Sequence, residues 1–157
     1  MLEIAELAEE VCELLTEAEK KLAVAEFCTG GLLCSVLTSI PKCGGALEQG
    51  FITYTKEAKA RSLGIEKALL DEHGVISPEC AKAMAEGARS KSNVDFGIAI
   101  TGVAVPDTAE GKPVGLVYLA GASNNDTVVM RFNFGNLERD TIRELSAYSA
   151  LDLLLGK

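Results

Sequence analysis

Three small residues, Thr29, Gly30 and Gly31, separate a short apolar run, Leu22–Glu26, from a stretch with helical spacing. The helical stretch carries its apolar residues on one face: Leu33, Val36 and Leu37. Such a turn leaves backbone N–H groups unpaired at the positive end of a helix dipole, where a phosphate or a developing oxyanion can bind. Considered alone, the turn is better interpreted as a plain strand-to-helix connection capped by Thr29.

Tyr54 and Lys59 form a second candidate group, because they flank a predicted strand-to-helix junction and could reach one pocket. A lysine can act there as a base if burial or a neighbouring cation lowers its pKa. A tyrosine and a lysine at this spacing are common by chance. By spacing alone, a half-buried tyrosine and a surface lysine are therefore the better interpretation.

The segment from Thr101 to Gly115 is a third candidate, since it is rich in Gly, Pro, Asp and Lys. Long loops in compact domains often carry function, although a disordered connection is the alternative interpretation. The chain has a net charge of −8, so an anionic ligand would need local cations. Lys59, Lys112 and Arg143 are the candidates for that role.

Composition excludes several classes of protein. The acidic balance argues against general nucleic-acid binding, and no apolar run is long enough to span a bilayer. The single histidine, His73, and the absence of a CxxC pair argue against a zinc site. Five cysteines without paired short spacings predict reduced thiols and a cytoplasmic protein.

The order of elements predicts a single α/β domain over residues 1–157, with a mixed sheet and helices on both faces. The near-continuous apolar runs Leu22–Glu26 and Val94–Ile100 are predicted as central strands. The alternating stretch Thr127–Phe134 is predicted to lie nearer an edge, in an antiparallel hairpin. The helix that starts at Ser77 is rich in alanine, which implies close approach to a neighbour and makes a homo-oligomer the expected state.

Several motifs follow one another in the order of a known family. They read EFCTGG from Glu26, GFITYTKEAK from Gly50, LLDEHGVISPECAKAMAEGA from Leu69, and TGVAVPDTAEGKPVG from Thr101. Together they resemble the C-terminal domain of the competence/damage-inducible CinA family. The corresponding family patterns are ESCTGG, GFVTYSNEAK, HGAVS…MAxGA and TGIAGPxGG…KPVG, and Arg143 matches the arginine of a closing GxRxxIR-type motif.

The resemblance implies a reaction, because stand-alone members of the family include nicotinamide mononucleotide amidohydrolases. They hydrolyse the carboxamide to give nicotinate mononucleotide and ammonia, and no metal or organic cofactor is implied. This chemistry needs a nucleophile, a base and donors for the oxyanion. Tyr54 and Lys59 are implied as the activating groups. The positions implied to bind the nucleotide are Glu26, Thr29, Gly30, Gly31, Thr101, Gly102, Lys112 and Arg143.

The chain departs from the family pattern at positions that the reaction depends on. The resemblance implies a serine nucleophile in a P-G-S-S-A or P-G-A-S-x loop, whereas this chain has PKCGG from Pro41, with Gly44 in the serine position. Phe27 replaces the serine of ESCTGG with a bulky ring beside the site. Family glycines are replaced in the later loop by Val105, Thr108 and Ala109. We therefore predict little or no amidohydrolase activity, with Gly44→Ser restoring some of it and Phe27→Ser adding to that gain.

Three functional hypotheses follow from these departures. The chain could be an amidohydrolase that uses Cys43, beside the missing serine, as a substitute nucleophile, with a thiol pKa lowered by Lys42 or Lys59. It could instead bind a nucleotide without turning it over. It could also keep the fold for assembly with other proteins.

Overall fold

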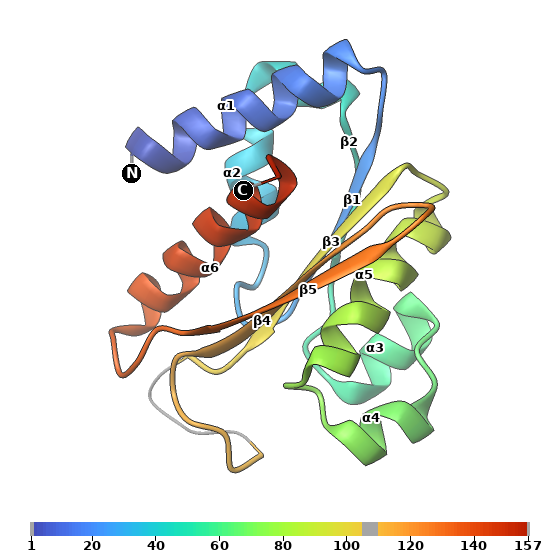
Figure 1. The fold of residues 1–157 in the computed structure, drawn as a ribbon, viewed down its shortest axis with the longest axis vertical. Helices are drawn as coiled ribbons and strands as arrows, with labels where there is room; N and C mark the ends of the chain where they lie inside the picture. Colours follow the sequence, from blue (N-terminus) through green and yellow to red (C-terminus); the bar gives the residue numbers. More distant parts are fainter. Residues whose placement is uncertain (1, 105–109, 157) are drawn as a thin grey trace.

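The computed structural model describes residues 2–104 and 110–156 as a five-stranded mixed sheet with helices on both faces (Figure 1). The strands are β1 (Leu22–Glu26), β2 (Leu47–Ile52), β3 (Phe96–Gly102), β4 (Leu116–Ala122) and β5 (Thr127–Asn133). The helices are α1 (Leu2–Glu17), α2 (Leu32–Thr38), η1 (Pro41–Gly45, a 3-10 turn), α3 (Lys56–Leu63), α4 (Lys67–His73), α5 (Pro78–Ser92) and α6 (Arg139–Leu154). None of the helices over the described residues is long and apolar enough to cross a membrane.

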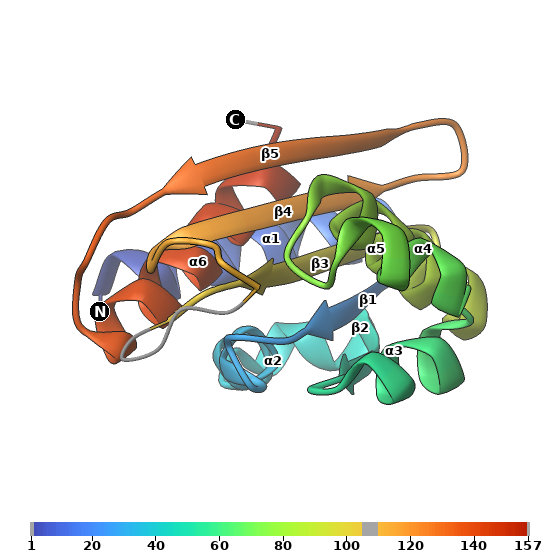
Figure 2. The same ribbon diagram turned by 90° about the horizontal axis from the view of Figure 1, so that it is seen from below.

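The strand order is β2-β1-β3-β4-β5, with β1 parallel to both of its neighbours and β3, β4 and β5 antiparallel in turn. Figure 2 shows β5 and β2 at opposite edges of this sheet. The predicted α/β class, the central β1 and β3 and the edge position of β5 are therefore confirmed. The register pairs Glu26 with both Ile52 and Ile100, so the carboxyl ends of the three parallel strands lie side by side.

Two apolar cores, one on each face of the sheet, hold the layers together. Helices α1, α2 and α6 cover one face, and α3, α4 and α5 cover the other (Figure 1). Because side chains alternate along a strand, β1 sends Leu22 and Val24 into the first core and Ala23 and Ala25 into the second. Burial on both faces explains why β1 reads as a continuous apolar run.

Helix α5 begins as its sequence predicts, with Ser77 accepting a hydrogen bond from Cys80 N at 3.1 Å and Pro78 in the first turn. Its alanines are fully buried: Ala81, Ala85 and Ala88. They lie in the core between this helix and the sheet, where Gly97 of β3 has no Cβ to meet the backbone of α5. Packing within one chain therefore accounts for the small side chains that suggested close contact with a neighbour.

Two strand boundaries differ from the sequence prediction. The apolar residues Phe51, Ile52 and Tyr54 predict a strand, whereas β2 runs over Leu47–Ile52. Its first residues were not predicted because they lie on an exposed edge of the sheet and lack an apolar pattern. Strand β3 starts at Phe96, since Asn93 ends α5 in the left-handed conformation (φ 53°) and Val94 N still donates to Arg89 O at 3.2 Å.

Candidate functional site at the carboxyl ends of β1, β2 and β3

The parallel part of the sheet contains a topological switch point. The chain leaves β1 to form β2 on one side and then crosses to form β3 on the other side. In open α/β sheets, ligands bind in the crevice outside the carboxyl ends of the strands at such a point. This edge of the sheet holds the sequence candidates from three places in the chain: after β1, after β2 and at the end of β3.

The turn after β1 is held by a buried carboxylate. Glu26 is fully buried, and its oxygens accept hydrogen bonds from Leu33 N at 3.0 Å, Cys34 N at 2.9 Å and Thr29 Oγ1 at 2.5 Å. Gly30 and Gly31 have φ values of 58° and 105°, which glycine adopts without strain. Thr29 thus donates to Glu26 and does not itself cap α2, and two N–H groups of the first helical turn are already satisfied inside the protein.

Lys59, Phe27 and Tyr54 meet beside that turn. The Lys59 side chain is fully buried, and its Nζ donates to Thr53 O at 2.7 Å. The same Nζ lies 3.9 Å from the centre of the Phe27 ring, and the Phe27 and Tyr54 ring centres are 5.0 Å apart. Tyr54 remains 59% exposed, so this group opens to solvent on the tyrosine side. The sequence interpretation of Lys59 as a surface lysine is wrong.

Burial sets the protonation of Lys59. Desolvation lowers its pKa from 10.5 to about 8, against the opposing influence of Cys80, Cys28 and Glu110. Its described hydrogen-bond acceptor is a backbone carbonyl, which stabilises an ammonium less than a carboxylate does. A large fraction of this amine can therefore be neutral at mildly alkaline pH, as a general base requires.

We expect Lys59→Met to change how the free energy of unfolding depends on pH. A lysine whose pKa is lower in the folded state binds its proton more readily when unfolded, so it makes stability rise between pH 8 and 10.5. The stability of the unaltered chain minus that of the variant should increase by up to about 3 kcal/mol over this range. Urea unfolding at several pH values measures this difference.

Lys56→Met is the matched control on the same helix, because Asp71 raises the pKa of Lys56 through a hydrogen bond. Subtracting the free energy of unfolding of each variant from that of the unaltered chain also removes the effect of the buried thiols of Cys28 and Cys80, which all these proteins share. Their pKa values are raised by burial to about 12, so they lower stability as the pH rises above 9. An unchanged slope in Lys59→Met would contradict a desolvated lysine at this position.

Arg143 connects α6 to the turn after β1. Its Nη2 donates to Thr29 O at 2.8 Å and lies where a Cβ at Gly30 would come within 3.3 Å. Its side chain is 31% exposed, and Asp140 Oδ1 lies 3.8 Å from Nη1. The guanidinium thus combines a fixed position with access to solvent at the crevice.

The end of β3 and the segment before β4 are tied to the α4–α5 junction. Thr101 is fully buried and donates to Val75 O at 2.6 Å. Glu110, which the sequence did not single out, accepts from Val75 N at 2.9 Å and Ile76 N at 3.0 Å. Gly102 is buried in β3, and Lys112 is partly buried in the segment before β4. The departures at Val105, Thr108 and Ala109 lie outside the described residues.

Cys43 and Gly44 lie at the opposite end of the parallel strands. They belong to η1, which precedes β2, and Leu22 N at the start of β1 donates to Ala46 O at 2.8 Å. A strand the length of β2 separates this end from Tyr54 by about 17–20 Å. Cys43 is also buried and forms a disulfide with Cys12. Its predicted role as a substitute nucleophile is therefore corrected, and so is the predicted reduced state of Cys12 and Cys43.

The side chain next to Lys59 and Tyr54 is that of Phe27. It is not that of residue 44, where the sequence interpretation puts the nucleophile. The residue directly after β1 is the one that Lys59 and the Tyr54 ring contact. The signal was present in the sequence, because Phe27 replaces a serine in the motif that follows the central strand. Its place beside Lys59 depends on α3 returning across the end of β1, which spacing does not predict.

Over the residues that the structure describes, no group of three or more His, Cys, Asp or Glu side chains could hold a metal ion. The groups that meet at this edge of the sheet are an aromatic pair, a buried lysine, an arginine and a glycine turn. These groups can hold a planar ring and an anion, and they can transfer a proton at Lys59 Nζ.

Known proteins match this chain over most of its sequence. A model of the CinA C-terminal domain matches residues 4–157. A putative competence-damage inducible protein of Caldicellulosiruptor bescii is 42% identical over 96% of this chain, and a CinA-like protein of a Synechococcus strain is 47% identical over 94%. The chain spans 37% and 36% of the length of these two relatives.

Solved structures give the same result. The competence/damage inducible protein of Agrobacterium tumefaciens matches with a TM-score of 0.95 and 35% identity, over 98% of this chain and 94% of that one. A CinA superfamily protein of Escherichia coli matches with a TM-score of 0.93 and 31% identity, over 97% and 88%. This chain belongs to the CinA C-terminal domain family.

Proposed function

We propose that this chain binds a nicotinamide nucleotide at the carboxyl ends of β1, β2 and β3 and hydrolyses its carboxamide weakly or not at all. The observation that carries the proposal is the contact of Phe27 with both Lys59 and Tyr54. The two groups that would activate a nucleophile face an aromatic ring, which has neither a proton to give nor a lone pair to attack with.

Hydrolysis of a carboxamide requires an oxygen or sulfur atom to attack the carbonyl carbon while a base accepts its proton. In this chain the base candidate Lys59 donates to Thr53 O and lies over the Phe27 ring. The electron-rich face of that ring favours the charged lysine, which cannot accept a proton. Phe27 therefore removes the nucleophile and also opposes the protonation state that catalysis needs.

The groups suited to binding remain in place. Tyr54 is 59% exposed, so its ring can pack against a planar ligand ring, as it already packs against the tilted ring of Phe27. Arg143 and the Gly30–Gly31 turn lie at the switch point, where a phosphate would find a cation in an otherwise acidic chain. Lys112 is a further candidate for the charge.

Calorimetric titration with nicotinamide mononucleotide, with ammonia assayed in the same sample, tests this proposal. We expect saturable binding without ammonia release, and we expect Arg143→Met to weaken binding at least about tenfold, as loss of a charge-assisted contact does. Arg131→Met, an exposed arginine on the edge strand β5, is the matched control and should bind normally. Absence of binding would favour a purely structural role, and ammonia release would show that the chain is an enzyme.

A further inference from the structure

The disulfide between Cys12 and Cys43 joins α1 to η1. We propose that this pair is a redox-sensitive link that sets how firmly residues 13–42 are held on the domain. That segment carries β1, Phe27, the Thr29–Gly31 turn and α2, so the link encloses the whole first half of the crevice. The proposal does not depend on which ligand the crevice takes.

The polar contacts that the structure describes between α1 and η1 lie on the surface. Lys42 Nζ lies 2.9 Å from Glu13 Oε1, with the two side chains 59% and 40% exposed. Thr16 Oγ1 donates to Lys42 O at 3.4 Å. Surface ion pairs of this kind stabilise a fold by little. The covalent bond is therefore the strongest direct connection between the two elements.

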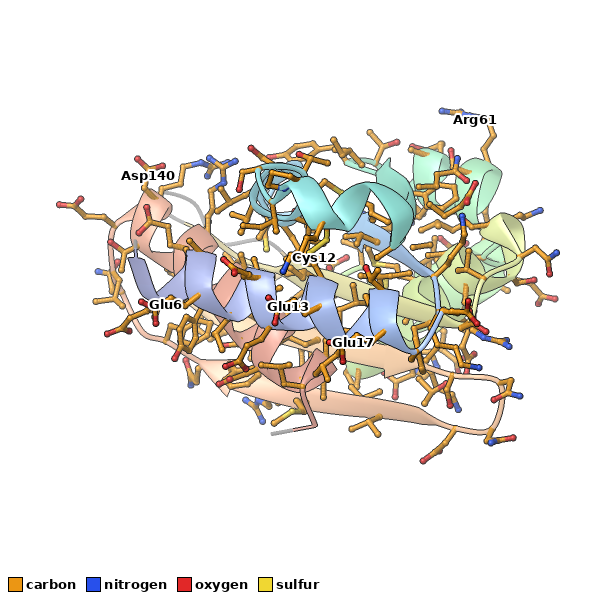
Figure 3. All side chains as sticks on the ribbon, turned by 90° about the horizontal axis from the view of Figure 1, so that it is seen from above. Glu6, Cys12, Glu13, Glu17, Arg61 and Asp140 are labelled. Atoms are coloured by element: carbon orange, nitrogen blue, oxygen red, sulfur yellow. A yellow bond between two sulfur atoms is a disulfide. The ribbon has the colours of Figure 1, made fainter. Side chains whose placement is uncertain are left out.

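Figure 3 shows Cys12 on α1 beside the segment that contains α2, with Glu6, Glu13 and Glu17 along the same helix. Both bonded cysteines are buried, at 0% and 2% exposure, and belong to the core that also holds Cys28, Leu33 and Leu37. When reduced, the two thiols can remain in that core as small apolar groups. Reduction should therefore loosen the fold and leave its topology unchanged.

The cross-link closes a loop with a sequence separation of 31 residues. Constraining a loop of this size removes conformational freedom from the unfolded chain, so the oxidised form is the more stable one. For a domain of this length, the melting temperature should differ between the two forms by on the order of 5–15 °C.

The redox step is a thiol–disulfide exchange. Two cysteine thiols and one molecule of a disulfide oxidant, such as oxidised glutathione, give the Cys12–Cys43 bond and two molecules of reduced thiol. The free cysteines are poor partners for internal shuffling, because burial raises the pKa of the Cys28 and Cys80 thiols to about 12 and also raises that of Cys34. An external dithiol that reaches the buried bond through local opening of the fold can therefore reduce it without rearranging it.

Counting thiols in the unfolded chain tests the pairing. After refolding with oxidised glutathione, removal of excess reagent and alkylation in denaturant, mass spectrometry should find three alkylated cysteines: Cys28, Cys34 and Cys80. The reduced chain should show five. Alkylation of all five cysteines after oxidation, or a different pairing in the peptide map, would overturn the proposal.

Thermal unfolding and hydrogen exchange test the consequence of the bond. The oxidised chain should melt higher than the reduced chain, and amides of α2 and η1 should exchange faster on reduction while those of β4 do not. The double variant Cys12→Ala/Cys43→Ala should lose this redox response, and Cys34→Ala should keep it. Equal melting temperatures of the oxidised and reduced unaltered chain would overturn the proposal even if the double variant fails to fold.

Discussion

Replacing Phe27 by serine should raise the rate of ammonia release from nicotinamide mononucleotide by roughly 10²–10⁴-fold over the unaltered chain, the gain typical of a positioned base acting on a nucleophile. The substitution removes the ring that lies 3.9 Å from Lys59 Nζ and puts a hydroxyl at the start of the same side chain. It also leaves Tyr54 without its aromatic neighbour, so both activating groups gain access to the new hydroxyl. A coupled ammonia assay measures the rate.

Three controls separate a new nucleophile from a merely enlarged site. Phe27→Ala opens the same space without a hydroxyl and should stay inactive. Adding Lys59→Met to Phe27→Ser should remove the gain. Gly44→Ser, which the sequence alone favoured, should have no effect, because Gly44 is exposed at the other end of β2. Equal activity of the serine and alanine variants at position 27 would refute this account of the site.

Replacing Glu26 by alanine should lower the free energy of unfolding by about 2–5 kcal/mol, because each buried donor left without its acceptor costs about 1–3 kcal/mol. The variant leaves Leu33 N and Cys34 N without their acceptor and frees the Thr29 hydroxyl inside the core. Helix α2 has no other side-chain cap, since Gly31 stands at its N-cap. Chemical denaturation measures the loss.

Glu48→Ala is the matched control for Glu26→Ala. Glu48 lies on the neighbouring strand β2, where its exposed carboxylate pairs with Lys21 at 3.4 Å. Removing that surface pair should change stability by less than about 1 kcal/mol. If both glutamates gave the same small effect, Glu26 would not hold the turn as described.

The central strands β1 and β3 could be predicted because a strand that is buried on both faces appears in the sequence as a continuous run of apolar residues. Leu22–Glu26 reads as a two-sided buried strand, and so does most of β3. Strand β2 could not be predicted in full, because Glu48, Gln49 and Gly50 lie on an exposed edge where no burial pattern is imposed. Register with β1, a tertiary interaction, makes it a strand.

The sequence could name residues for the candidate site, but it could not show which of them lie next to one another in space. The structure brings Tyr54, Lys59, Thr29 and Arg143 to one edge of the sheet, and the side chain next to Tyr54 and Lys59 is that of Phe27 rather than that of residue 44. Spacing along the chain does not show that PKCGG precedes β2 while Tyr54 follows it, so the sequence alone predicts one pocket for both. Likewise, Glu26 was expected to bind a ligand, and its full burial gives it a structural role.

Ammonia release from carboxamide-labelled nicotinamide mononucleotide, with the unaltered protein in molar excess over the nucleotide, tests the central claim most directly. Excess protein makes even slow turnover visible as a single event and does not depend on product release. We predict that the bound nucleotide is recovered with its carboxamide intact while Phe27→Ser converts it. Stoichiometric labelled ammonia from the unaltered chain, abolished by Lys59→Met, would contradict the claim that Phe27 has removed the reaction.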